Sequence, residues 1–264
     1  MQPAKEKKKS NHFNKKYMIK TVKYVRMVVQ LIFFVLLPSL FDQAFTGVKN
    51  TADAIGKGNV LQWDSFTKIL LILLIVTLLF GRVFCGYACA FGALGDYIYF
   101  LTGKIRACIN IKVKHGKAGK IKYPVLAVIL ILCFLGKKDL VTKYSPWTVF
   151  SFIASGNFKE TFSSSLASII IFGVIIVAMS VEERFFCRHL CPMGAVFAIV
   201  PSGILARIHK GKNCISSCHA CSKNCPRGIE PGAEEERGEC ITCLRCVVVC
   251  PGKNLSIVNN KAKN

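Results

Sequence analysis

The sequence predicts an all-α membrane bundle of four transmembrane helices in two repeated halves, followed by a small α+β domain. Three observations predict this fold class. The 264 residues are 52% hydrophobic, and their mean hydropathy of +0.43 is too apolar for an ordinary soluble domain of this length. Four apolar runs interrupt an otherwise basic chain, and 14 cysteines gather in regularly spaced motifs.

Each apolar run is close to the roughly 20 residues that an α-helix needs to cross a hydrocarbon core. The runs lie at about 27–45, 66–84, 121–136 and 165–181. The first run follows a long basic segment, and no small-residue cleavage site follows it. We therefore expect it to remain as an anchor and not to be removed as a signal peptide.

The basic residues predict the orientation in the cell membrane. Lys and Arg number 36 against 14 Asp and Glu, and they concentrate before the first run, between the second and third runs, and in the C-terminal region. Under the positive-inside rule, an even number of spans places both termini in the cytoplasm. A nucleic-acid footprint is the other interpretation of such charge. Because these residues flank apolar spans, membrane lipid is the expected partner, and nucleic acid is not.

The chain divides into three expected parts. Residues 1–23 form a basic cytoplasmic arm, residues 24–206 the four-helix membrane domain, and residues 207–264 the small C-terminal domain.

Eight cysteines of the C-terminal domain follow a C-x2-C-x2-C-x3-C-P pattern twice, with one additional residue in the first gap of the upstream copy. This spacing is typical of two [4Fe-4S] clusters in a ferredoxin-like dicluster domain, where the fourth cysteine of each run binds the other cluster. One predicted ligand set is Cys214, Cys218, Cys221 and Cys250, and the other is Cys240, Cys243, Cys246 and Cys225. Two four-thiolate zinc sites or a domain without metal are the alternatives, but zinc ribbons do not use the x3-C-P ending.

Four further cysteines form a repeat at the ends of the second and fourth apolar runs. The pattern R-x-F-C-x3-C-x2-G-A occurs twice, with Cys85 and Cys89 in one copy and Cys187 and Cys191 in the other. Because an even number of spans separates the copies, both face the same leaflet, and a pseudo-two-fold axis would bring the four thiols together. They could bind an additional Fe-S centre or another soft metal, act as redox-active thiol pairs, or be structural.

The remaining polar and cysteine residues carry weaker expectations. Asp96, Glu182 and Glu183 lie near the two membrane-face motifs, where we expect ion pairs more than proton transfer. Cys108 and Cys133 have no motif around them and are expected to be small buried hydrophobes. The sequence contains no constellation of nucleophile, general base or phosphate loop, so we predict no catalytic residues and no stand-alone bond-making enzyme.

These motifs resemble the membrane 4Fe-4S ferredoxins (polyferredoxins) of the NapH, NosR and CcoG types. The resemblance extends over about residues 24–257 and rests on the four spans, the two C-x3-C motifs and the C-terminal pair of cluster motifs. One departure is Ala90, where the family has a proline after the second cysteine, while Pro192 keeps the pattern.

The resemblance implies an electron-transfer component of an oxidoreductase system, which relays electrons between a quinone pool or cytoplasmic reductant and a partner redox protein. The outer loops are too short for a flavin domain, so a separate flavin- or haem-bearing subunit is a further candidate partner. Two other functions remain open: a metal (copper) reduction or assembly factor that uses the membrane-face cysteines, and a redox sensor.

Overall fold

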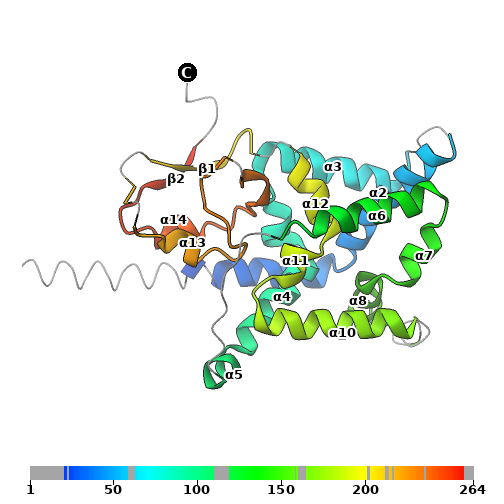
Figure 1. Ribbon diagram of the computed structural model, residues 1–264, viewed down its shortest axis with the longest axis horizontal. Coiled ribbons are helices and arrows are strands. Elements are labelled where there is room, and N and C mark those ends of the chain that lie inside the picture. Colours follow the sequence, from blue (N-terminus) through cyan, green and yellow to red (C-terminus); the bar gives the residue numbers. More distant parts are fainter. Residues whose placement is uncertain are drawn as a thin grey trace, which may run out of the picture.

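The computed structural model describes residues 21–22, 24–58, 63–109, 119–157, 159, 165–200, 203–211, 214–215, 217–234 and 236–258. Nearly all of the expected arm 1–23 therefore lies outside the described residues. A helical body occupies one end of the molecule, and the two strands with helices α13 and α14 occupy the other (Figure 1).

The first half begins with two helices joined at a sharp bend. The helix Tyr24–Leu36 and helix α2 (Leu40–Gly56) meet at 65°, with Pro38 between them. Proline lacks the N–H that a continuous helix needs, which accounts for the break. Helix α3 (Ser65–Phe80) packs along α2 and ends at Gly81, whose φ of 76° suits a glycine after the last turn.

The first C-x3-C motif follows α3 directly. It forms the π-helix η1 (Phe84–Ala88) and leads into α4 (Ala90–Leu101) and α5 (Gly103–Cys108). The next helices are α6 (Lys122–Phe134), α7 (Lys138–Lys143), α8 (Pro146–Ala154) and α10 (Leu166–Val181). The second motif forms α11 (Phe185–His189) and opens α12 (Pro192–Ile199).

An aromatic cluster joins the two halves of the helical body. Helix α10 packs against α4 and α8, while α6 packs against α2 and α12. Phe91, which follows the first motif, lies 4.5 Å in ring-centroid distance from Phe186 of the second motif. The Trp147 ring meets Phe45 edge-on at 4.9 Å. Burial of these rings fixes the ends of the two motifs against each other.

The lengths of the helices leave the four spans as a prediction. Within the described ranges, no single helix combines the length and the apolar composition needed to cross a membrane, although the bent pair Tyr24–Leu36 and Leu40–Gly56 does so together. Helices α3 and α10 have 16 residues each and α6 has 13. At a rise of about 1.5 Å per residue, they extend roughly 20–24 Å.

The C-terminal segment contains a two-stranded sheet and two short helices that pack together. Strand β1 (Arg207–Lys210) pairs antiparallel with β2 (Leu255–Val258), with Arg207 opposite Val258. Helices α13 (Ala220–Lys223) and α14 (Arg245–Val249) each follow one residue in the left-handed region, His219 and Leu244. A 3-10 turn, η2 (Arg237–Glu239), contacts α12. This turn links the segment to the helical body.

Candidate functional site

The second cysteine of each C-x3-C motif has the same local geometry in both copies. Cys89 and Cys191 are the N-cap residues of α4 and α12, with φ/ψ of −71°/112° and −65°/112°. The Cys191 thiol accepts a hydrogen bond from the Gly194 N–H at 3.2 Å, whereas the Cys89 side chain makes no capping hydrogen bond to α4. Proline is tolerated at the first helical position. Ala90 in place of proline therefore leaves the backbone conformation of the second cysteine unchanged.

The first cysteines lie on different helix types. Cys85 belongs to the π-helix η1, a helix type frequently found at functional sites, whereas Cys187 lies in the short α-helix α11. Arg184, just before α11, has a left-handed φ of 58°. This conformation is uncommon for a residue with a side chain and persists only where surrounding contacts hold it.

The structure brings the four membrane-face thiols into one neighbourhood. Burial raises the pKa of Cys89 well above its usual value, and Cys187, Cys85 and Cys191 raise it further. Burial also raises the pKa of Cys191, again with contributions from Cys187 and Cys85. Thiols that oppose each other's ionisation in this way need a bound positive charge to become thiolates together. Within the described ranges, no three His, Cys, Asp or Glu side chains lie close enough to hold a single metal ion.

Each motif arginine reaches across to the other motif. Arg184 donates to the carbonyl oxygen of Cys85, and its Nη1 lies 3.5 Å from where a Cβ at Gly92 would be. Arg82 Nη2 lies 3.0 Å from the corresponding position at Gly194. The glycines leave room for the guanidinium groups, and the contacts are exchanged between the two repeats.

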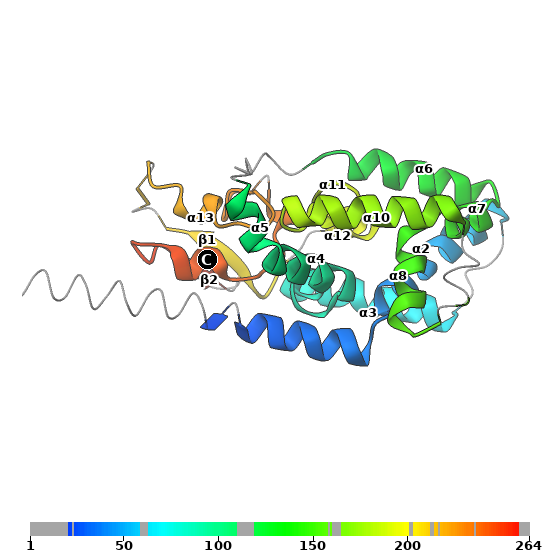
Figure 2. The same cartoon turned by 90° about the horizontal axis from the view of Figure 1, so that it is seen from below.

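Asp96 on α4 neutralises Arg184. Its Oδ1 accepts from Arg184 Nε at 2.9 Å, and its Oδ2 accepts from Arg184 Nη2 at 2.6 Å, Arg26 Nη2 at 2.7 Å and Gln30 Nε2 at 2.8 Å. Burial alone would raise the pKa of Asp96, but Arg184 and Arg26 outweigh it and hold the pKa below its ordinary value. Figure 2 shows the helix Tyr24–Leu36 beside α4, where Arg26 makes this contact.

Glu239 of the C-terminal segment neutralises Arg82. Arg82 Nη1 lies 3.3 Å from Glu239 Oε2 and donates to the Gly238 carbonyl oxygen at 2.9 Å. Lys122 and Arg227 also pair with Glu239. Burial would raise the pKa of Glu239, but Arg227, Arg82 and Lys122 bring it down to about 2. One carboxylate therefore joins α6, the first motif and the C-terminal segment.

The expected ion pairs of the other two acids are confirmed. Glu182 pairs with Arg188 within the second motif. Glu183 accepts a hydrogen bond from Arg245 Nη1 of the C-terminal segment at 2.9 Å, and its Oε1 forms an ion pair with Arg245 Nη2 at 2.7 Å. The second pair is a further bridge between the helical body and the C-terminal segment.

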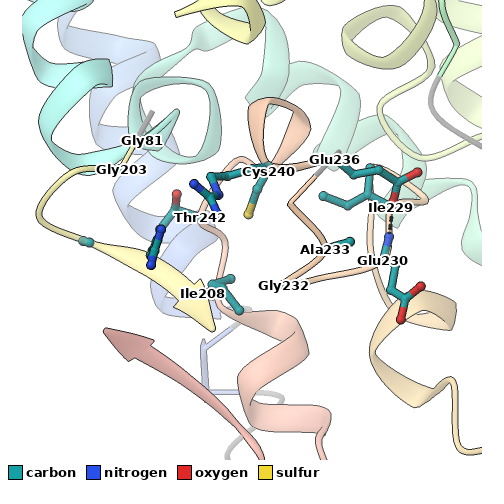
Figure 3. A pocket seen from close by; sticks show the side chains of 13 residues that line it. Gly81, Gly203, Ile208, Ile229, Glu230, Gly232, Ala233, Glu236, Cys240 and Thr242 are labelled. Atoms are coloured by element: carbon teal, nitrogen blue, oxygen red, sulfur yellow. Dashed lines mark hydrogen bonds between the residues drawn. The ribbon is translucent and has the colours of Figure 1, made fainter. Parts of the chain in front are cut away.

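The cysteine loop that begins at Cys240 rests directly on the first motif. A Cβ atom at Gly86 would overlap the carbonyl oxygen of Ile241, and a Cβ at Gly81 would lie 3.1 Å from Thr242 Oγ1. A small cavity of about 30 Å³ lies beside Cys240, lined by residues that include Gly81, Gly203 and Thr242 (Figure 3). That volume holds roughly one water molecule. The loop and the motif are thus in close contact.

One predicted ligand set of the C-terminal motifs also shares a neighbourhood. Burial raises the pKa of Cys240 to about 12, with further contributions from Cys243 and Cys225. Burial also raises the pKa of Cys246, and Cys243, Cys240 and Cys225 raise it further. All four cysteines of the other predicted set are partly exposed. Two of them, Cys214 and Cys221, contribute to the raised pKa of Lys210, after its hydrogen bond to Glu230. Cys108 is exposed, contrary to expectation, and Cys133 is buried as expected.

The residues around these thiols fit an anionic iron–sulfur group. Arg82, Arg184, Arg188 and Arg227 are essentially inaccessible to solvent. Several of their N–H groups have no hydrogen-bond partner among the described residues: Arg82 Nε, Arg188 Nε and Nη2, and Arg227 Nη1. Buried cations with unpaired donors need a negative partner. A cube held by four thiolates carries net negative charge, and its sulfurs accept hydrogen bonds.

The comparisons with known proteins assign the same chemistry. A family described as a 4Fe-4S binding domain matches residues 69–108 and 164–212. The two matched segments contain both C-x3-C motifs and end before Cys214. The resemblance to the NapH and NosR types is confirmed, and the chain is an iron–sulfur protein.

Individual relatives match over most of the chain. An uncharacterized protein of Methanocaldococcus jannaschii is 28% identical over 90% of this chain and 95% of its own length. The ferredoxin-type protein NapH of Haemophilus influenzae is 26% identical over 72% of this chain and 67% of its own. Protein NirI of Paracoccus denitrificans is 29% identical over 71% of this chain but only 28% of its own. No solved structure gives a significant match.

The sequence patterns did not identify the charged residues that hold the site together. Arg82 and Arg184 stand in the repeated motif, and their recurrence before each cysteine pair was a usable signal. Glu239 gave only a weak signal, since an acid directly before a ligand cysteine is usually solvent-exposed. Its partner Arg82 lies 157 positions away.

Proposed function

We propose that this protein is a membrane-bound electron carrier with two [4Fe-4S] clusters in its C-terminal domain and a further iron–sulfur centre at Cys85, Cys89, Cys187 and Cys191. It relays electrons between a quinone pool or cytoplasmic reductant and a partner redox protein. The observation that carries the proposal is the direct contact of the loop after Cys240 with the first C-x3-C motif at Gly86 and Gly81.

The proposed ligand sets follow the cysteine spacing, and the proximity of one set of cysteines to one another supports that set. Cys225, Cys240, Cys243 and Cys246 hold one cluster, and Cys214, Cys218, Cys221 and Cys250 hold the other. When bound, such clusters exchange single electrons without making or breaking bonds in the protein. The chain's own contribution is to hold the thiolates, exclude water and provide fixed positive charge. The positive charges of Arg82 and Arg227 favour the thiolate form of cysteines in both the membrane-face and the C-terminal sets.

Exposed apolar side chains support the membrane location. Helices α3, α6 and α10 and the helix Tyr24–Leu36 each present a row of exposed large hydrophobic residues, such as Ile72, Ile131, Val177 and Val35. Large apolar side chains exposed in such number on several helices are typical of a lipid or protein contact. Together with the basic flanks of the apolar runs, it favours lipid and an orientation with both termini in the cytoplasm.

A cavity of about 220 Å³ is a candidate place for a quinone headgroup. It lies between the helix Tyr24–Leu36, α4, α13 and α14, with a lining that includes Arg26, Tyr99 and Asn224. Arg26 is buried, and its Nε and Nη1 have no partner among the described residues. A quinone carbonyl oxygen would accept such a bond. Anaerobic addition of a quinol analogue tests this branch: cluster bleaching supports it, and reduction by dithionite alone favours a cytoplasmic reductant.

Iron counting tests the additional centre. The intact chain is purified without oxygen, and its iron, sulfide and EPR signals are compared with those of a Cys85→Ser/Cys187→Ser variant. Three cubes predict about twelve irons falling to about eight. About eight irons in both proteins would refute the membrane-face centre. Cys108→Ser is the matched control and should keep the full iron content, because Cys108 is exposed and outside every motif.

A further inference from the structure

We propose that Glu239 of the C-terminal domain is a positioning residue for the membrane-face site. Its carboxylate balances the charge of Arg82, as the carboxylate of Asp96 balances the charge of Arg184. The inference deepens the proposed function, because it concerns how that site is completed. It rests on the repeat in the sequence and on the ion pairs of Arg82 and Arg184.

The repeat defines which positions correspond. The same spacing separates Arg82 from Arg184, Cys85 from Cys187 and Gly92 from Gly194. Each arginine packs against the glycine of the other motif. Four residues after Gly92 comes Asp96, which binds Arg184 with two hydrogen bonds. Four residues after Gly194 comes Ala198, which offers no carboxylate.

The missing carboxylate is replaced from outside the repeat. Gly238 packs so closely on α12 that a Cβ there would overlap the carbonyl oxygen of Ala198. This approach places Glu239 beside Arg82, at 3.3 Å between Oε2 and Nη1. The side chain of Glu239 is 12% exposed, and that of Arg82 is 1% exposed. The absence of a side chain at Gly238 is therefore what allows the turn to dock.

The two halves of the site consequently differ in how their charge is balanced. The pair of Asp96 and Arg184 lies wholly within the helical body. Arg82 obtains its carboxylate only when that domain is docked. Because Glu239 directly precedes Cys240, docking also sets the position of a predicted cluster ligand. The membrane-face site is thus complete only with the C-terminal domain in place.

Glu239→Gln in the full-length protein, purified without oxygen in lipid nanodiscs, tests the proposal. Hydrogen–deuterium exchange is followed in peptides that cover 81–89 and 192–199. We expect both to exchange faster by a factor of about ten or more, since a buried cation loses its partner. Peptides of α10 should stay unchanged, which separates local release from unfolding. Glu234→Gln, which removes an exposed ion pair with Arg237, is the matched control and should exchange as the unaltered chain does.

A second variant distinguishes positioning from general packing. Ala198→Asp, added to Glu239→Gln, returns a carboxylate to the position that corresponds to Asp96. We expect it to restore slow exchange in 192–199. The EPR signal that is absent from Cys85→Ser/Cys187→Ser belongs to the membrane-face centre, and we expect its reduction potential to return to the value of the unaltered chain. Unchanged exchange in Glu239→Gln, or no recovery with Ala198→Asp, would overturn the proposal. A low iron count in the intact chain would instead refute the additional centre, and the exchange data would still decide the role of Glu239.

Discussion

Replacing Asp96 with asparagine removes a buried negative charge while keeping the shape of the side chain. Asp96 is 5% exposed and pairs with the guanidinium groups of Arg184 and Arg26, whose side chains are 0% and 2% exposed. Breaking a buried ion pair by removing one partner costs about 3–5 kcal/mol, because the other charge stays buried without compensation. That cost corresponds to a factor of roughly 10² to 10⁴ in the folding equilibrium.

Thermal unfolding of the anaerobic protein measures this loss. At about 2–4 °C per kcal/mol for a chain of this size, Asp96→Asn should lower the Tm by roughly 6–20 °C. Glu234→Gln is the control, because the side chain of Glu234 is 83% exposed and an exposed pair contributes at most about 1 kcal/mol. A decrease for Asp96→Asn no larger than that of the control would refute the role of Asp96 as the counter-charge of Arg184.

Three further outcomes follow from the same contacts. Gly86→Ala should loosen the C-terminal domain and raise its protease sensitivity, because the new Cβ would overlap Ile241; Gly173→Ala, with open space around it, should not. The Tm difference between the unaltered protein and Asp96→Asn should stay constant from pH 8 to pH 5 and shrink only below about pH 4. The pKa of Asp96 is lower in the folded than in the unfolded chain. Its stabilisation is therefore present above the unfolded pKa of about 3.9 and is lost as the pH falls through the folded pKa. Cys108→Ser should leave the EPR spectrum unchanged because this thiol is exposed.

Periodicity and spacing predicted the parts of the site that repeat along the chain. The apolar runs at 66–84 and 165–181 correspond closely to α3 and α10. The repeated motif predicted that Cys85, Cys89, Cys187 and Cys191 would converge, and the structure places them in one neighbourhood. Such patterns are local, so each can be recognised without knowing what packs against it.

Contacts between distant residues could not be predicted in the same way. The bridge from Arg82 to Glu239 crosses most of the chain, and hydropathy places both side chains at the surface. The helices α7 and α8 also escaped prediction, because they lie in a segment between apolar runs that hydropathy treats as an outer loop. Burial of a charge is decided by the partner that arrives from elsewhere, and a linear pattern does not contain that partner.

The buried arginines change the interpretation of the basic composition. The excess of Lys and Arg was attributed to anionic lipid, yet Arg82, Arg184, Arg188 and Arg227 are buried beside cysteines. Under the proposed function, these cations lower the cost of placing negative charge on the thiolate sites, and a site among fixed cations accepts an electron more easily. Arg227 acts on both Cys187 and Cys225. Because one cation serves both sites, charge added at one site weakens the stabilisation left for the other, so their potentials should depend on each other.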